Sequence, residues 1–366
     1  MIEILCCYGI ITLSNHELKS RRLRMDHVVT FGEIMLRLKS PGHERFFQSP
    51  FLEATFGGGE ANVAVSLSLL GESSRFVTAL PDNAIGDAAV AEVRKYGVDV
   101  SAIKKVKQAR LGIYFLETGA NQRPSKVVYD RDNSAISMAK SSDFDWNAVF
   151  AQASWFHITG ITPALSQTSA DCAAAAMCEA KERGITVSID LNYRKKLWNY
   201  GKKAPEVMDQ LVRYADVVIA NEEDIQMCLG IDAAADVTSG TLSDSVYEQL
   251  AHKVKSTYTN VSIVAITLRE SISADRNGWR GVIAGTKGFF QSKRYAIDDI
   301  VDRVGGGDSF CAGLIYGLRH MDEQSAVEFA AAASALKHSI PGDFNLTLKS
   351  EIEALLKGDG SGRVQR

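Results

Sequence analysis

The sequence predicts an α/β fold with a mostly parallel central sheet, helices on both of its faces and a small β-sheet lid. Three observations predict it. Short apolar, β-rich runs recur at intervals of roughly 30–45 residues, the span of repeated βαβ units. Helical segments that end at glycine lie between these runs. Residues 103–131 instead alternate apolar and polar side chains, which is typical of antiparallel strands with one polar face.

The N-terminal half supplies the first strands and helices in order. A glycine or proline follows each element and ends it. The predicted elements are a strand at 28–31, a helix at 61–70, a strand at 75–80 and a helix at 85–96. Alternating runs at 111–117 and 126–129 follow, separated by a turn-rich segment. Together with residues 33–55, these runs are expected to form the lid.

Beyond residue 141 the alternation of strands and helices resumes. The predicted strands lie at 155–158, 186–189, 217–220 and 262–267, and the predicted helices at 170–183, 311–319 and 325–338. Right-handed crossovers between parallel strands would place these helices on both faces of the sheet. The chain is therefore expected to form one large α/β domain over residues 25–350, with the lid inserted from 33–55 and 103–131.

Composition excludes several classes of protein. With 46% hydrophobic and 23% charged residues among 366, the chain resembles an average globular protein. A net charge of -3 gives no support for a nucleic-acid partner. Six cysteines without metal-like spacing argue against a zinc site or a disulfide scaffold, so we expect a cytoplasmic protein. No window holds the roughly 18 continuous apolar residues of a membrane span, so no membrane partner is expected.

Both ends of the chain are expected to lie outside the domain. In residues 1–24 an apolar run precedes the basic residues, which is the reverse of a signal peptide. This segment is read either as a non-native or disordered leader before a natural start at Met25, or as a mobile N-terminal tail. Residues 351–366 are expected to form a flexible C-terminal tail.

The segment 302–310, with the sequence DRVGGGDSF, carries the strongest local signal. Gly305, Gly306 and Gly307 let successive backbone N–H groups point one way, and the positive end of the following helix adds to them. Such a site suits a phosphoryl group, and Asp308 at its edge could take a proton from a hydroxyl. On spacing alone, a simple glycine turn in which Asp308 caps the helix is an equal alternative.

A second glycine cluster, FGGGEAN at 56–62, precedes the first helix. Here the side-chain amide of Asn62 could meet a ligand hydroxyl, although a capped helix start is the alternative. No G-x-x-x-x-G-K-[ST] sequence is present, and no G-x-G-x-x-G follows the first strand. P-loop and dinucleotide-binding folds are therefore unsupported.

Taken together, the two glycine motifs resemble those of the pfkB (ribokinase-like) family of carbohydrate kinases. Residues 57–64 match the first family pattern, and 302–310 match the second, D-T-x-G-A-G-D-x-F, with Arg303 for Thr and Gly306 for Ala. The resemblance runs from about residue 25 to residue 348. It implies a ribokinase-like fold, ATP and Mg²⁺ as cofactors, Asp308 as the general base, and Gly305, Gly306 and Gly307 around the transferred phosphoryl group.

Within that family the chain most resembles 2-keto-3-deoxygluconate kinases. Residues 190–194 followed by 197–198 resemble the D-x-N-x-R…L-W pattern of that group, and 129–131 resemble its Tyr-x-Arg contact. The resemblance implies phosphorylation of the C6 hydroxyl of this sugar acid. An arginine fork suits its carboxylate, although surface ion pairs are the alternative for the arginines. The implied sugar-binding residues are Gly58, Gly59, Asn62, Tyr114, Tyr129, Arg131, Arg194, Asp308 and Asp343.

The same resemblance implies a nucleotide site. Its residues are Asn192, Arg194, Asn221, Thr267, Arg269, Gly305 and Gly307. Asp224 stands where the family's N-x-x-E motif organises Mg²⁺, which would be held through water, and Arg269 replaces the glycine of a T-x-G nucleotide loop. Two alternatives remain: a kinase for another sugar such as fructose or ribose, and a catalytically silent sugar-binding protein. A homodimer through the exposed lid strands is also expected by analogy with the family.

Overall fold

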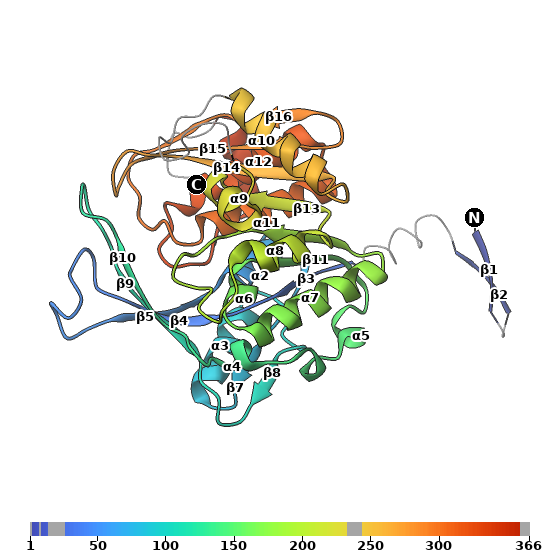
Figure 1. Cartoon of the computed structure of the whole chain (residues 1–366), viewed down its shortest axis with the longest axis horizontal. Helices are drawn as coiled ribbons and strands as arrows, with labels where there is room; N and C mark the ends of the chain where they lie inside the picture. Colours follow the sequence, from blue (N-terminus) through green and yellow to red (C-terminus); the bar gives the residue numbers. More distant parts are fainter. Residues whose placement is uncertain (1, 7–8, 14–25, 233–243, 359–366) are drawn as a thin grey trace.

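The computed structural model describes residues 2–6, 9–13, 26–232 and 244–358. A large sheet runs through the body and a smaller sheet projects from it (Figure 1). The large sheet has nine strands in the order β16-β15-β14-β13-β12-β11-β3-β6, with β17 paired to β15. These strands are β3 (His27–Phe31), β6 (Ser73–Val77), β11 (Ala153–Thr159), β12 (Thr186–Asp190), β13 (Val217–Ala220), β14 (Ile263–Ser271), β15 (Asn277–Ala284), β16 (Phe289–Gln291) and β17 (Tyr295–Ile297).

The strands from β6 to β14 are parallel, and β15 to β17 add an antiparallel edge. The strand expected at 75–80 is divided, because β6 ends at Val77 and a short strand, β7 (Ala79–Pro81), pairs instead with β8 (Lys104–Val106). Lys104 donates its backbone N–H to the Thr78 carbonyl at 2.9 Å, which draws the chain away from β3.

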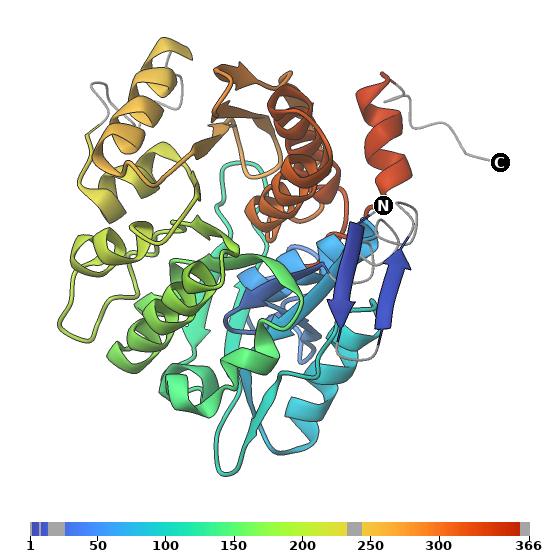
Figure 2. The ribbon, with the colours of Figure 1, turned by 90° about the vertical axis from the view of Figure 1, so that its right-hand side faces the viewer.

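Apolar side chains on the parallel strands alternate between the two faces of the sheet, so both faces are buried. Val218 and Val264 belong to one core cluster, whereas Val217 and Ala265 belong to the other. Helices cover both faces, as the turned view in Figure 2 shows. One face packs against α7 (Gln167–Glu182), α8 (Ala204–Val212) and α10 (Asp244–Thr257), and the other against α2 (Gly59–Leu69), α11 (Gly306–His320) and α12 (Glu323–Lys337). The predicted fold class is confirmed.

Six further helices fill the connections between these elements. They are α3 (Ala84–Arg94), α4 (Ala135–Met138), α5 (Trp146–Val149), α6 (Ile161–Ala164), α9 (Glu222–Leu229) and the short 3-10 helix η1 (Ser141–Asp143). The start of α11 differs from the prediction, because the helix begins at Gly306 and not at Cys311. Glycine is a poor helix former, yet Gly306 and Gly307 lie in the first turn of α11 and Gly305 is its N-cap.

The small sheet forms the lid, from the two segments that the sequence indicated. Its order is β10-β9-β4-β5, with β4 (Met35–Lys39), β5 (Glu53–Gly57), β9 (Gly112–Glu117) and β10 (Lys126–Asp130). β4–β5 and β9–β10 are antiparallel hairpins, as expected, but β4 and β9 pair in parallel. Parallel pairing follows from the connection, because the chain from β5 passes through the body before it returns as β9.

The structure describes part of each end of the chain. β1 (Ile2–Cys6) and β2 (Gly9–Leu13) form a hairpin that pairs with no other described strand, while residues 14–24 of the expected leader lie outside the described residues. In place of a flexible tail from residue 351, α13 (Lys349–Leu356) buries Ile352 completely against the α11–α12 face. Residues 359–366 lie outside the described residues. No described helix is long and apolar enough to span a bilayer.

Candidate active site

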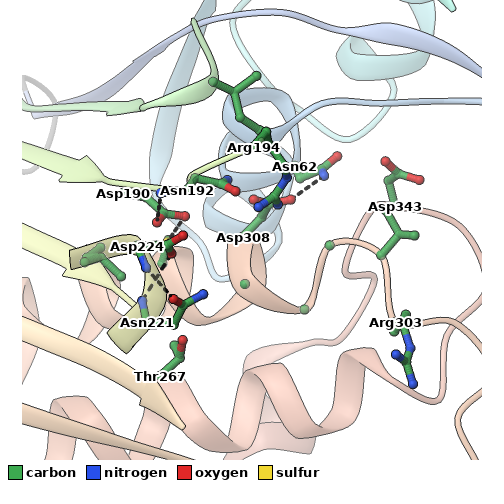
Figure 3. Close-up of a pocket in the computed structure, with 18 of the residues that line it drawn as sticks. Asn62, Asp190, Asn192, Arg194, Asn221, Asp224, Thr267, Arg303, Asp308 and Asp343 are labelled. Atoms are coloured by element: carbon green, nitrogen blue, oxygen red, sulfur yellow. Dashed lines mark hydrogen bonds between the residues drawn. The ribbon is translucent and has the colours of Figure 1, made fainter. Parts of the chain in front are cut away.

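A cleft of about 490 Å³ lies between the lid and the carboxyl ends of the parallel strands, the position that open α/β sheets use for ligands. Both glycine motifs line it (Figure 3). Every residue predicted for the site lines this one cleft: Gly58, Gly59, Asn62, Tyr114, Tyr129, Arg131, Asn192, Arg194, Asn221, Asp224, Thr267, Arg269, Gly305, Gly306, Gly307, Asp308 and Asp343.

Asp308 and Asn62 meet at the floor of the cleft (Figure 3). Asn62 donates from Nδ2 to Asp308 Oδ2 at 2.6 Å, and its Oδ1 accepts the backbone N–H of Gly58 at 3.1 Å. The second bond fixes the orientation of the Asn62 amide, so that its NH₂ group faces the carboxylate. Gly305 occupies the N-cap of α11 without a side-chain cap bond, and Asp308 stands in the first turn. The alternative of Asp308 as a helix cap is therefore wrong.

The environment of Asp308 suits proton transfer. Burial raises the pKa of Asp308 from its ordinary 3.8 to about 6, and the nearby carboxylate of Asp343 acts in the same direction. The bond from Asn62 and the charges of Arg194 and Lys337 act in the opposite direction. A carboxylate with a pKa just below neutrality is ionised at pH 7 and still basic enough to accept a proton.

The glycine loop, residues 305–308, needs its glycines for conformation and for close approach. Gly305 has φ +82°, a left-handed conformation that other residues rarely adopt, and a Cβ there would lie 2.1 Å from the Asp343 carbonyl oxygen. The first N–H groups of α11 have no partner inside the helix, and the helix dipole adds positive potential at the same point. The glycine loop therefore offers an anion site directly beside Asp308.

On the lid side of the cleft, Arg131 is held by an acidic partner that the sequence reasoning missed. Its Nε donates to Glu33 Oε2 at 2.8 Å, and Nη2 contacts the same oxygen. Ser134 Oγ donates to Glu33 Oε1 at 2.6 Å, and the guanidinium lies 5.3 Å from the Tyr129 ring centre. Both charged side chains are buried, so Arg131 reaches the cleft as part of a fixed pair.

A second network ties the lid to the body. Tyr114 Oη donates to Asp343 Oδ1 at 2.5 Å, and Arg37 Nη1 donates to the same oxygen at 2.7 Å. Arg37 also pairs with Asp302. All four side chains are buried, and Tyr114 Oη and Asp343 Oδ1 are bonded to each other. The sequence reasoning also missed Arg37, although a period-two count along β4 places it on the same face as Met35, which lines the cleft.

The opposite end of the cleft holds two buried aspartates, Asp190 and Asp224. Burial raises the pKa of Asp190 well above its ordinary value, and Asp224 and Asp308 add to the effect; burial also raises the pKa of Asp224 to about 6. Asp224 accepts the backbone N–H groups of Tyr193 at 2.9 Å and Asn221 at 3.2 Å. Among the described residues neither carboxylate has an ion-pair partner, and no group of three or more acidic, His or Cys side chains could hold a metal alone.

Two arginines approach the same end of the cleft. The guanidinium of Arg269 lies 5.4 Å from the Trp279 ring centre, and Arg194 is exposed on the chain that follows β12. The expected nucleotide loop at 267–269 is instead part of β14, because these residues pair with 279–281 of β15. Alternation along the strand buries Leu268 and turns Thr267 and Arg269 toward the cleft.

A family model described as "pfkB family carbohydrate kinase" matches residues 25–346. The chain belongs to the pfkB family. Similar proteins include a 2-dehydro-3-deoxygalactonokinase from Haloferax volcanii, which is 32% identical over 92% of this chain and 98% of the relative. A 2-dehydro-3-deoxygluconokinase from Bacillus subtilis is 27% identical over 87% of this chain and 91% of its own length. The crystal structure of a 2-dehydro-3-deoxygluconokinase from Thermotoga maritima superposes with a TM-score of 0.85 at 50% identity, covering 91% of this chain and 99% of that one.

This pfkB chain is therefore a carbohydrate kinase, a phosphotransferase with an alcohol acceptor. The predicted family and the likeness to 2-keto-3-deoxygluconate kinases, the same enzymes under another name, are confirmed. Kinases of the pfkB family take their phosphoryl group from ATP.

Proposed function

We propose that this kinase transfers the γ-phosphoryl group of ATP to the C6 hydroxyl of 2-keto-3-deoxygluconate, with Asp308 as the general base. One observation carries the proposal: Asn62 aims the Asp308 carboxylate into the cleft beside the glycine loop. A base, an anion site and a sugar-sized cleft occur together there. The names of the similar proteins support a keto-deoxy sugar acid as substrate.

Proton transfer in the proposed reaction involves one group. Asp308 accepts the proton of the C6 hydroxyl as that oxygen attacks the γ-phosphorus, and the bond to the β-phosphate oxygen breaks. The backbone N–H groups of the glycine loop meet the charge on the transferred phosphoryl group. Asn62 holds the carboxylate in place throughout, and Gly58 fixes Asn62 in turn.

The acidic end of the cleft fits a Mg²⁺ ion that accompanies the nucleotide. Asp190 and Asp224 are buried, act electrostatically on each other and have no ion-pair partners among the described residues, an arrangement that a cation would stabilise. Mg²⁺ is often held by one or two carboxylates together with water and substrate phosphates. Asp224 would hold the ion through water, and the ion would neutralise charge on the phosphates. Asn192, Asn221, Thr267, Arg194 and Arg269 surround the space left for ATP.

The carboxylate of the sugar acid would meet Arg131. Two of its nitrogens contact Glu33, which fixes the plane of the guanidinium and leaves Nη1 without a hydrogen-bond partner among the described residues. Tyr129 stacks near the guanidinium and limits its movement. An orientation fixed in this way lowers the entropy cost of binding a carboxylate.

The pairing of Arg131 with Glu33 also favours a second candidate, a kinase for a neutral sugar such as fructose. Glu33 neutralises Arg131, so a substrate carboxylate is not needed to satisfy the guanidinium. In that case Arg131 would be structural, and neutral hydroxyls would occupy the lid side of the cleft.

A coupled assay of ADP formation tests the proposal across 2-keto-3-deoxygluconate, 2-keto-3-deoxygalactonate, fructose and ribose. The expected result is a kcat/KM for a keto-deoxy acid at least a hundredfold above that for the neutral sugars. A preference for fructose or ribose would reject the sugar-acid proposal. Asp308→Asn should keep the fold and lose nearly all turnover, and near-normal turnover would reject the base.

A further inference from the structure

Lys337, the last residue of α12, is a buried cation that the mechanism above does not use. Its side chain is 0% exposed. Nζ donates to the Ile340 carbonyl at 3.0 Å, and no carboxylate of the described residues lies within ion-pair distance of it. Its aliphatic stem runs beneath the glycine loop, where Cε lies 3.3 Å from the Cβ position of Gly305.

A buried ammonium without a paired carboxylate is costly, so its retention calls for a compensating charge nearby. The surrounding region supplies three carboxylates, Asp302, Asp343 and Asp308, and one other buried cation, Arg37. Arg37 alone pairs with both Asp302 and Asp343. Lys337 is a second positive charge in the same buried region as these two carboxylates.

We propose that Lys337 is a positioning residue for phosphoryl transfer, whose buried ammonium sets the charge balance behind the glycine loop so that Asp308 stays ionised and the loop accepts an anionic phosphoryl group. The inference rests on the role proposed for Asp308. Lys337 does not line the cleft, so it acts only through the glycine loop and through its charge.

The charges around Asp308 come from several elements and give the sign of the effect. Lys337 and Arg194 favour its ionised form, whereas Asp343 opposes it, and Asp190 and Cys311 face the same buried space. Burial lowers the pKa of Lys337 itself, and the carboxylates of Asp302, Asp343 and Asp308 counter that effect. Without Lys337 the region carries one more uncompensated negative charge, which disfavours ionisation of Asp308.

Ser334 provides a matched control for simple packing. It lies one turn before Lys337 on α12, it is 0% exposed, and its Oγ donates to the Gly306 carbonyl at 2.7 Å. Ser334→Ala therefore disturbs the same loop from the same helix without changing any charge. A role for Lys337 in packing alone would give both variants the same kinetic behaviour.

The test is the pH dependence of kcat for wild type, Lys337→Met and Ser334→Ala, each with its thermal unfolding midpoint. In Lys337→Met the acidic limb should move up by about one pH unit, and kcat at pH 8 should fall on the order of tenfold. Ser334→Ala should keep the wild-type limb. Should Lys337→Met not fold, Lys337→Gln, whose amide can still donate to Ile340, replaces it with the same expected shift.

An unshifted limb in a folded Lys337 variant, or an equal shift in Ser334→Ala, would overturn the inference. Asp308→Asn, measured alongside, separates this failure from failure of the proposed function. If Asp308→Asn is inactive while the Lys337 limb is unshifted, only the role of Lys337 is rejected. If Asp308→Asn retains turnover, the general base itself is rejected.

Discussion

Asn62 donates its side-chain amide to the carboxylate of Asp308 across 2.6 Å, although the two residues stand 246 positions apart. The bond joins the first turn of α2 to the first turn of α11 and so brings the two glycine motifs to one point. The chemistry proposed for this kinase depends on that junction, because it aims the base and favours its ionised form.

The acidic limb of the pH profile should report on Asp308. Because its pKa is raised to about 6, the proton-accepting form is lost as the pH falls through about 6. We expect kcat/KM to rise with pH and to level off near pH 7. Asp224, also with a pKa raised to about 6, could contribute, so the profile of Asp224→Asn is the control. If the acidic limb moves in Asp224→Asn and in no variant next to Asp308, the titration would be assigned to Asp224.

Asn62→Asp should move that limb to higher pH. It places a second carboxylate within hydrogen-bond distance of Asp308, and two carboxylates so close cannot both ionise near neutral pH. We expect kcat at pH 7 to fall at least about tenfold, in part recovered by raising the pH. Asn62→Ala, which removes the donor without adding charge, should shift the limb less. Equal limbs in Asn62→Asp and wild type would contradict the geometry.

Glu60 should make folding stability depend on pH. Burial raises its pKa from 4.5 to about 7, although Thr159 and Thr162 donate to Oε1 at 2.9 and 2.8 Å. The folded state thus holds this proton more tightly than the unfolded state. The stabilisation of the folded state by the protonated Glu60 is therefore complete below about pH 4.5 and lost by about pH 7. The loss amounts to about 3 kcal/mol.

Denaturant unfolding of Glu60→Gln against wild type measures this contribution. The difference in unfolding free energy between the two proteins should change across that pH window and stay constant above about pH 8. A constant difference from pH 4 to 8 would show that Glu60 does not titrate as described.

Gly305→Ala and Gly307→Ala should separate stability from catalysis. At Gly305 a methyl group would clash with the Asp343 carbonyl and strain a left-handed backbone, so we expect a loss of about 2–3 kcal/mol in unfolding free energy. At Gly307 a methyl group meets no atom within 4 Å, and alanine favours a helix, so stability should be kept or gained.

The methyl group at Gly307 would nevertheless project beside the cleft, where the phosphoryl group is proposed to approach. We expect kcat of Gly307→Ala to fall on the order of tenfold. Thermal unfolding together with kcat checks both variants. A stable Gly307→Ala with full activity would remove Gly307 from the phosphoryl site.

Arg131 should determine affinity for the acid group of the sugar. Removing Arg131 alone leaves Glu33 buried and unpaired, at a cost of about 3–5 kcal/mol, so the informative variant is Arg131→Met with Glu33→Gln. We expect the KM for 2-keto-3-deoxygluconate to rise at least about tenfold with little change in the KM for ATP. Glu33→Gln alone, as control, should keep or improve affinity. An unchanged sugar KM in the double variant would favour the neutral-sugar alternative.

Much of this site could be predicted because its parts are local. Glycine clusters, the aspartate beside them and the parallel strands are visible in short stretches of sequence, and Asp308 and Asn62 were found in this way. Glu33, Arg37 and Lys337 were missed because each acts through a partner far away in the chain. Nothing in the neighbourhood of Arg131 indicates that Glu33 will pair with it. The extension of β14 through Arg269 depended likewise on its pairing with β15.

The parallel pairing of β4 with β9 has a consequence for the order of folding. The β4–β5 and β9–β10 hairpins can each form from neighbouring residues, but joining them closes a loop that contains α2, β6 and α3. Closing so long a loop costs chain entropy, and this cost is smaller once the intervening helices and strands have folded. The lid should thus be among the last parts of the molecule to assemble. A newly made chain would gain the lid side of its cleft only after the large sheet is already in place.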